Sequence, residues 1–208
     1  TALTRHGDLP WPHKSDDVWR RTDVSLLDPM RGFAPVEPGL LQSVGLNESQ
    51  FAGMVNPLGG EQLLVRVNGA WLSDETPQGV VVQDLTAAAS DHPEPIRAAI
   101  AADGLTDAEQ KLSTLNTAFH HDDLFLQVPA GFTATQPLRL VHILTASAKQ
   151  AIFPMTVVQV GAGSSVTLID EYVSVDPSGS TEPHLVNGRI ELLIEPDAHV
   201  HVVRLQRW

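Results

Sequence analysis

The sequence contains no cysteine, a single tyrosine and few basic residues, and each scarcity excludes a class of protein. Without cysteine the 208-residue chain forms no disulfide and offers no thiolate to a metal, which agrees with a reducing compartment. Only 13 Lys and Arg stand against 25 Asp and Glu, and the formal net charge is −12. Because phosphate binding needs clustered cations, we expect no contact with nucleic acid.

Long apolar runs are also missing. No stretch approaches the roughly 18 apolar residues that a membrane-spanning helix needs, and the segment from Thr1 to Trp11 has no apolar signal-peptide core. We therefore expect a soluble protein of the cytoplasm that does not contact a membrane. The hydrophobic content of 42% is enough for a packed core in one large domain or two small ones.

The second half of the chain contains a repeated layout, in which an apolar strand, a tight corner of small residues and a second strand follow one another. Three such units occupy residues 125–144, 157–173 and 189–205. A layout that returns every thirty residues or so, at roughly the period of solenoid repeats, is typical of architectures in which each unit buries its apolar face against the next. We expect residues 119–208 to form successive coils of a mainly β, parallel β-helix.

Residues 1–118 are expected to form a smaller mixed α+β region. Asn68-Gly69 is a strong signal for a two-residue β-hairpin turn. Capping patterns predict one helix from Pro93 to Ala102 and another from Asp107 to Phe119. A further short helix is expected over residues 15–27.

His199 and His201 are the strongest candidates for chemistry. They lie two residues apart on an expected strand, so both imidazoles point to one face and can approach a metal together. A cupin-type site also needs a carboxylate a few residues on, and residues 202–207 supply none. A surface or packed histidine pair is therefore favoured. A cupin-like metal-dependent enzyme or binding protein that uses the two histidines is the alternative.

The other histidine and glycine clusters are better explained by local structure. Residues 120–123, His-His-Asp-Asp, fit a polar turn, His92 precedes Pro93 in a helix cap, and Gly161-Ala-Gly163 lacks the glycine spacing of a nucleotide loop. No Ser, Thr or Lys is flanked by recognisable catalytic partners. The sequence therefore predicts no catalytic residue, no cofactor-binding residue and no metal ligand, and we expect no enzyme.

The segment Pro12-His-Lys-Ser-Asp-Asp-Val-Trp-Arg-Arg-Thr-Asp23 resembles the N-terminal signature of the SufB/SufD family of iron-sulfur cluster assembly proteins. In that signature a Trp is followed by a basic residue, an aromatic, Thr and Asp, and here Arg21 replaces the aromatic. The hairpin, residues 79–82, residues 91–94 and residues 115–131 follow in the order expected of the family. The resemblance covers nearly the whole chain.

The resemblance implies a SufD-like, non-enzymatic scaffold that acts with SufB and the ATPase SufC. The implied fold is a right-handed parallel β-helix preceded by a small mixed α+β region. The iron-sulfur cluster then belongs to the complex, and this chain alone binds no cofactor. Family members continue with more β-helix and a helical segment that docks the ATPase. The absence of Cys favours the SufD-like role over the SufB-like one.

Two further expectations concern the ends of the sequence. Trp19, a large aromatic in a polar stretch, is expected to anchor the N-terminal segment by burial. Residues 200–205 are largely apolar and run almost to Trp208 without a polar closing helix. This pattern predicts self-association of the last coils, most simply as a two-fold homodimer.

Overall fold

The structure is a computed structural model, and it describes residues 1–23, 32–36, 48–68, 70–72, 77–101, 105–120, 123–145, 149–174 and 184–207. The helices are α1 (Ala2–Asp8), α2 (Glu48–Val55), α3 (Leu85–Asp91), α4 (Pro93–Ala101) and α5 (Asp107–Phe119). The strands are β1 (Ala34–Pro35), β2 (Gln62–Val67), β3 (Ala70–Trp71), β4 (Val81–Asp84), β5 (Leu124–Val128), β6 (Leu138–Leu144), β7 (Gln150–Ile152), β8 (Met155–Val160), β9 (Ser165–Ser174), β10 (Leu185–Val186), β11 (Arg189–Ile194) and β12 (His199–Arg207). None of the described helices is long and apolar enough to cross a membrane.

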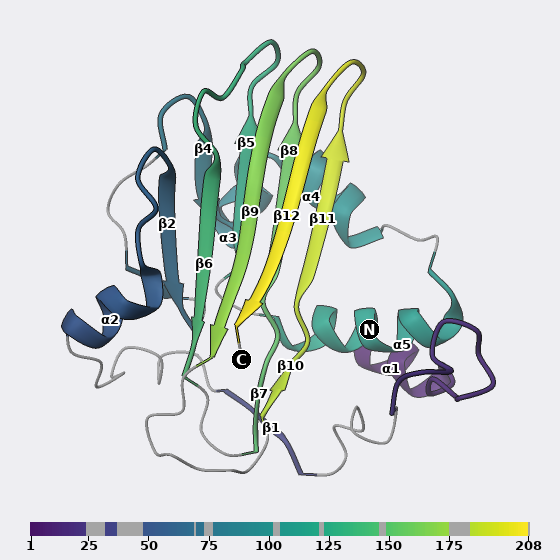
Figure 1. Cartoon of the computed structure of the whole chain (residues 1–208). Helices are drawn as coiled ribbons and strands as arrows, with labels where there is room; N and C mark the ends of the chain where they lie inside the picture. Colours follow the sequence, from purple (N-terminus) through teal and green to yellow (C-terminus); the bar gives the residue numbers. More distant parts are fainter. Residues whose placement is uncertain are drawn as a thin grey trace.

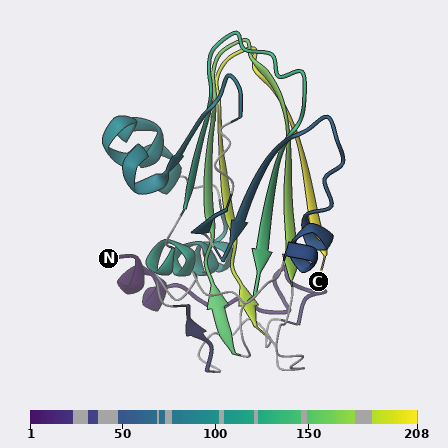
Figure 2. The same ribbon diagram turned by 90° about the vertical axis from the view of Figure 1, so that its left-hand side faces the viewer.

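The strands form three sheets, and this confirms the prediction of a mainly β protein. The strand orders are β12-β9-β6-β2-β3, β11-β8-β5-β4 and β1-β7-β10. Among the described strands, only β3 and β4 pair antiparallel to their neighbours, and the other pairs are parallel. The two larger sheets face each other as two layers (Figures 1 and 2).

The three predicted strand-corner-strand units are confirmed as β5 with β6, β8 with β9, and β11 with β12. In each unit the chain leaves one large sheet at the corner and enters the other. Equivalent residues of successive units lie side by side, as Leu126, Val158 and Leu192 do. The parallel pairing agrees with stacked coils and excludes an up-and-down antiparallel arrangement of these strands. The right-handed parallel β-helix stays a prediction.

The main core lies between the two large sheets. Leu64, Leu140 and Leu168 reach it from the five-stranded sheet, and Leu126 and Val158 reach it from the four-stranded sheet. Side chains alternate between the two faces of a strand, so the period of two in the sequence places every second residue in this core. The helices cover the outward faces: α3 and α4 pack on the four-stranded sheet, and α2 packs on the five-stranded sheet.

Each corner contains one residue with a left-handed backbone, which lets the chain turn sharply between the sheets. Gly131 and Gly163 have φ values of +70° and +66°, and Asp197 occupies the third corner with a φ of 60°. The corners also stack closely. A Cβ atom on Gly161 would lie 2.5 Å from the backbone nitrogen of Ala130, so only glycine fits at this position.

The N-terminal half extends the two large sheets. The predicted hairpin is confirmed, because Val67 pairs with Ala70 across the turn, but β2 pairs over its whole length with β6. The predicted helices are confirmed as α4 and α5, and the capping box of Thr106 and Glu109 opens α5. Nothing in the sheet pattern assigns the boundary between residues 118 and 119, which stays a prediction.

The helix predicted over residues 15–27 is wrong where the structure describes it. Residues 14–20 form turns, and residues 24–27 lie outside the described residues. Backbone hydrogen bonds of 2.9 Å join Asp16 to His13, Trp19 to Asp16, and Thr22 to Trp19. The Asp16 side chain also accepts the backbone N–H of His13, and these contacts between residues three apart close separate turns in place of the bonds between residues four apart that make an α-helix.

Candidate functional site

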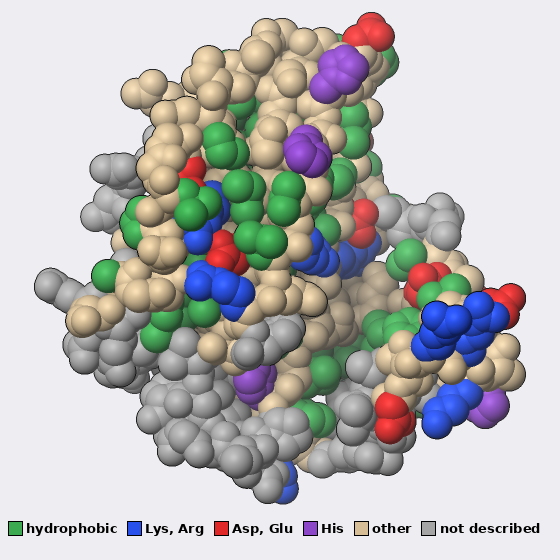
Figure 3. All heavy atoms as spheres, viewed as in Figure 1, with side chains coloured by type: hydrophobic (Ala, Val, Ile, Leu, Met, Phe, Trp, Pro, Cys, Tyr) green, Lys and Arg blue, Asp and Glu red, His purple; other side chains and the backbone are tan. Residues whose placement is uncertain are grey.

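Strand β12 carries the histidine pair that the sequence singled out. His199 and His201 are exposed and lie beside Ser165 and Thr167 of β9. Alternation along the strand places both imidazoles on the outward face of the five-stranded sheet, which also displays mixed charges among hydrophobic side chains (Figure 3). Among the described residues, no group of three or more His, Asp or Glu side chains could hold a metal ion. The pair thus offers two imidazoles, and no described carboxylate completes a set of ligands.

The middle of β9 holds two adjacent acids, Asp170 and Glu171, whose exposed fractions are only 0% and 2%. Consecutive side chains on a strand point to opposite faces of the sheet. Asp170 shares its row with Leu140 of the main core and faces the interior, so Glu171 faces outward. Each carboxylate is flanked by nitrogen donors from β6 and from β12.

The interior cluster contains His142, Asp170, Tyr172 and Arg204. His142 Nε2 lies 3.1 Å from Asp170 Oδ1, and Arg204 Nη2 lies 2.8 Å from Asp170 Oδ2. The rings of His142 and Tyr172 stack with centroids 4.5 Å apart. Burial lowers the pKa of His142 and raises the pKa of Tyr172. A neutral His142 then donates its Nε2–H to the carboxylate, which can only accept.

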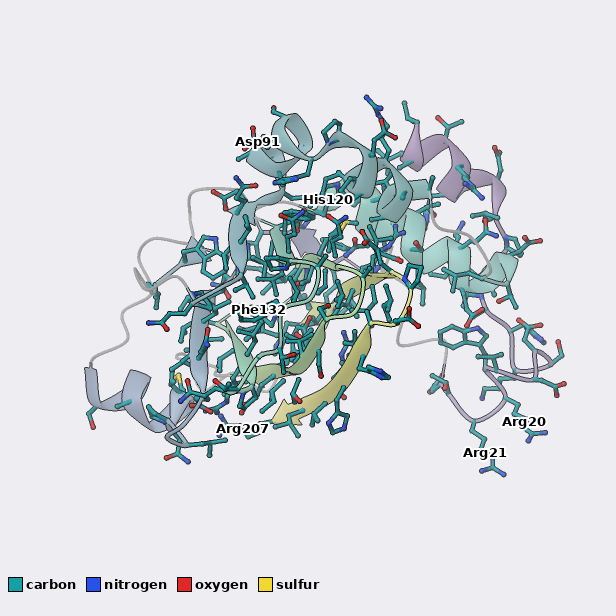
Figure 4. The ribbon with its side chains drawn as sticks, turned by 90° about the horizontal axis from the view of Figure 1, so that it is seen from above. Arg20, Arg21, Asp91, His120, Phe132 and Arg207 are labelled. Carbon is teal, nitrogen blue, oxygen red and sulfur yellow. The ribbon has the colours of Figure 1, made fainter. Side chains whose placement is uncertain are left out.

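The outward cluster joins three strands and a helix through Glu171. Arg139 Nε donates to Glu171 Oε2 at 2.8 Å, and Arg207 Nη2 lies 2.5 Å from Glu171 Oε1. Arg139 also pairs with Glu61 at 3.0 Å and donates to the carbonyl of Val55, the last residue of α2. Arg207 lies on the same side of the molecule as α2 (Figure 4). Its Nη2 also donates to the backbone carbonyl of Met54 in α2.

These contacts fix β12 against β9 on both faces of the sheet. The sequence alone did not indicate these contacts, because each partner lies about thirty residues from the next, roughly one solenoid repeat. The partners meet only when successive units stack in register. A usable signal does exist. Cations or histidine follow the first and third corners, at positions 139, 142, 204 and 207, and acids follow the second corner, at positions 170 and 171.

The remaining histidine candidates serve local structure. His120 Nδ1 contacts Asp123, whose other oxygen accepts the backbone N–H of Met155 at 2.8 Å. This contact ties the end of α5 to β8. Residues 121 and 122 lie outside the described residues. His92 stacks on Phe125 of β5, with ring centroids 5.1 Å apart.

The N-terminal segment is held to the body through Lys111 of α5. Its Nζ donates to the carbonyl of Leu9 at 2.9 Å and lies 5.0 Å from the ring centroid of Trp11. Trp19 is half-buried, while Arg20 and Arg21 point away from the body (Figure 4). The anchoring role expected of Trp19 stays a prediction.

The edges of β11 and β12 form the candidate assembly surface. These two strands are the outermost described members of their sheets, so each has one edge without a described partner strand. Two aliphatic side chains are prominent there, Ile194 with 51% and Leu205 with 41% of its surface exposed. A free strand edge is a template for pairing with a further strand. Such an arrangement can bind a further polypeptide strand through backbone hydrogen bonds.

Two family models match this chain over consecutive segments. The "SufBD protein N-terminal region" matches residues 2–140, and the "SUF system FeS cluster assembly, SufBD core domain" matches residues 142–208. A curated iron-sulfur cluster assembly SufBD family protein of Synechocystis sp. is 24% identical over 211 residues, covering 97% of this chain and 45% of the relative. The chain thus spans about half the length of that relative. On the strength of the two consecutive models, the chain belongs to the SufBD family.

Proposed function

We propose that this chain is a non-catalytic scaffold subunit in iron-sulfur cluster assembly, with a SufD-like role. Family membership supports the process, since the core model carries the description of cluster assembly in the SUF system. The observation that carries the scaffold role is the pair of ionic contacts that fix β12 to β9, one on each face of the sheet. Arg204 and Arg207 hold the strand against Asp170 and Glu171, and so its outer edge is held in a fixed register.

The proposed architecture is a right-handed parallel β-helix whose first three coils are the units ending in β6, β9 and β12. Parallel in-register pairing of each unit with the next supports it, as do the stacked corners at residues 129–131, 161–163 and 196–198. At the N-terminal end, the short antiparallel strands β3 and β4 close the two sheets. Trp71 Nε1 donates to Asp84 across that end at 3.2 Å.

The proposed partners are a SufC-like ATPase and a SufB-like scaffold in the cytoplasm. The iron-sulfur cluster is the cargo of the assembled complex. The sequence has no cysteine to ligate a cluster by itself, which fits the SufD-like role. Association of two copies through β11 and β12 is a second proposed use of the same edges, because a two-fold interface presents the same surface from both copies.

Co-purification tests the scaffold proposal. The tagged chain is expressed with the SufB-like and SufC-like proteins of the same genome, and the eluate is analysed by mass spectrometry. The expected result is a stoichiometric complex that survives moderate salt. A control variant, Asp17→Asn, changes a side chain that is 98% exposed, and it should leave the complex intact. Recovery of the tagged chain alone in all conditions would contradict the proposal.

A second candidate function is metal binding by His199 and His201, favoured by their exposure on one face of β12. The chain is purified in the presence of zinc, iron or manganese, and its metal content is measured. Stoichiometric metal that is lost in His201→Ala would favour this metal-dependent alternative. Equal trace metal in both proteins would favour the scaffold.

A further inference from the structure

A surface pocket of about 250 Å³ is lined by residues of α1, α5 and β11, by Ile100 near the end of α4, and by Leu105. None of the described lining residues belongs to the ionic clusters around β9. The helices α1 and α5, which supply most of the lining, run close together (Figure 1). Its volume is slightly below the range of roughly 300 to 1,000 Å³ that is usual for ligand pockets. A small ligand therefore fits its size.

One wall of the pocket is a polar stripe on α5. Gln110, Ser113, Thr114 and Thr117 are spaced so that they share one helix face, and all four line the pocket. Thr114 donates its hydroxyl to the carbonyl of Gln110 at 2.8 Å, and Thr117 donates to that of Ser113 at 3.0 Å. The threonine oxygens keep acceptor capacity, and the Ser113 hydroxyl can donate toward the pocket.

Two arginines line the same pocket. The Arg189 side chain is only 9% exposed and is fixed by Glu191 at 2.6 Å, by Thr117 at 3.0 Å and by the carbonyl of Ala99 at 2.8 Å. These bonds to described residues use three of the five N–H groups of the guanidinium. Two N–H groups can therefore donate to a ligand. Arg5 of α1 also lines the pocket, and its guanidinium donates to Gln110.

The remaining wall is apolar, and no described lining residue is acidic. Ile100 and Leu105 line the pocket with 43% and 40% of their surfaces exposed. Two arginines and no Asp or Glu among the described lining residues contrast with the net charge of −12 of the chain, although Glu191 pairs with Arg189 beside the pocket. The pocket thus combines cationic donors, hydroxyls and an aliphatic wall.

We propose that this pocket binds a small organic carboxylate with a short aliphatic chain. The carboxylate accepts hydrogen bonds from the guanidinium groups of Arg189 and Arg5, whose planar fork matches a carboxylate, while the aliphatic part covers Ile100 and Leu105. The Ser113 hydroxyl supplies a further donor. Such a site is independent of the scaffold function and of the free edges of β11 and β12.

Methyl-detected NMR with pentanoate as the probe tests the site, with the neutral isostere pentanamide and inorganic phosphate as comparison probes. Pentanoate should shift the methyl signals of Ile100 and Leu105 saturably, with a dissociation constant on the order of 1 mM for so small a ligand. Pentanamide should bind about tenfold more weakly, because it lacks the charge that strengthens hydrogen bonds to Arg.

Three variants complete the test. Arg5→Gln should weaken pentanoate binding about tenfold, the usual effect of losing one charge-assisted hydrogen bond. Ser113→Leu, which fills the pocket, should abolish binding, and circular dichroism checks that this variant folds. Arg97→Gln removes an exposed arginine of α4 outside the pocket and should change nothing. The proposal is overturned by equal binding of pentanoate and pentanamide, by shifts that do not saturate, by shifts with phosphate but none with pentanoate, or by unaltered binding in Arg5→Gln.

Discussion

Asp170→Asn is the sharpest test of the ionic lock between β9 and β12. Asp170 has no exposed surface, accepts a hydrogen bond from His142 and is paired at 2.8 Å with Arg204. The substitution keeps the size of the side chain and removes its charge. Arg204 has 39% of its side chain exposed and regains some hydration, whereas Arg66, which lies beside His142 in the neighbouring row, is 0% exposed and stays buried.

The expected cost follows from removing one partner of a buried ion pair. Such a change destabilises a protein by about 3 to 5 kcal/mol when the remaining charge is buried without compensation, and the partial hydration of Arg204 places the expected cost at the lower end, about 3 kcal/mol. At about 2 to 4 °C per kcal/mol for a chain of this size, the melting temperature should fall by about 6 to 12 °C. The measurement is urea unfolding at pH 7, followed by circular dichroism. Amide hydrogen exchange should also show faster exchange along β12.

The control for Asp170→Asn is Asp17→Asn. Asp17 is 98% exposed and lies 3.9 Å from Arg20, so its loss should change the free energy of unfolding by less than about 0.5 kcal/mol. If Asp170→Asn falls within the same range as the control, Asp170 does not hold β12, and the argument for a fixed edge loses its main support.

Three further outcomes are expected. Burial lowers the pKa of His142 in the folded chain below the ordinary 6.5, so on acidification the unfolded chain binds a proton at this histidine first. The free energy of unfolding should therefore fall as the pH drops below about 6.5 toward the pKa of the folded state, and the melting temperature of His142→Gln should fall less over the same pH range. Thr106→Ala removes the cap of α5 and should cost about 1 kcal/mol in urea unfolding, and an unchanged midpoint would show that the cap adds nothing. Gly161→Ala places a Cβ 2.5 Å from the backbone of Ala130 and should lower the melting temperature, whereas Gly53→Ala, which meets nothing within 4 Å, should not; equal melting of the two variants would refute the close stacking of the corners.

The parts of the fold that were predictable from the sequence are those with a local cause. The helix from Asp107 to Phe119 was placed by its capping box, and the hairpin by Asn68-Gly69, because both signals act over a few residues. The repeated units were placed by corners of small residues between apolar strands. In contrast, residues 14–20 form turns closed by backbone hydrogen bonds between residues three apart, where a helix was predicted.

The candidate site was less predictable, because its contacts depend on register between distant strands. Nothing local to Asp170 indicates that His142 lies on one side of it and Arg204 on the other. The pairing of β2 with β6, which draws the hairpin into the large sheet, is likewise set by packing across more than seventy residues. The family resemblance, carried by short ordered motifs, needed no such information and was confirmed by the family models.

We propose that this chain supports cluster assembly within a complex and holds no cluster by itself. Anaerobic reconstitution with iron and sulfide tests this role, by counting iron per complex for the SufB-like and SufC-like proteins with and without this chain. The expected result is that the chain alone retains no iron and that its addition raises the iron retained by the complex. Stoichiometric iron on the isolated chain, or a complex whose iron content is the same without it, would refute the proposed role.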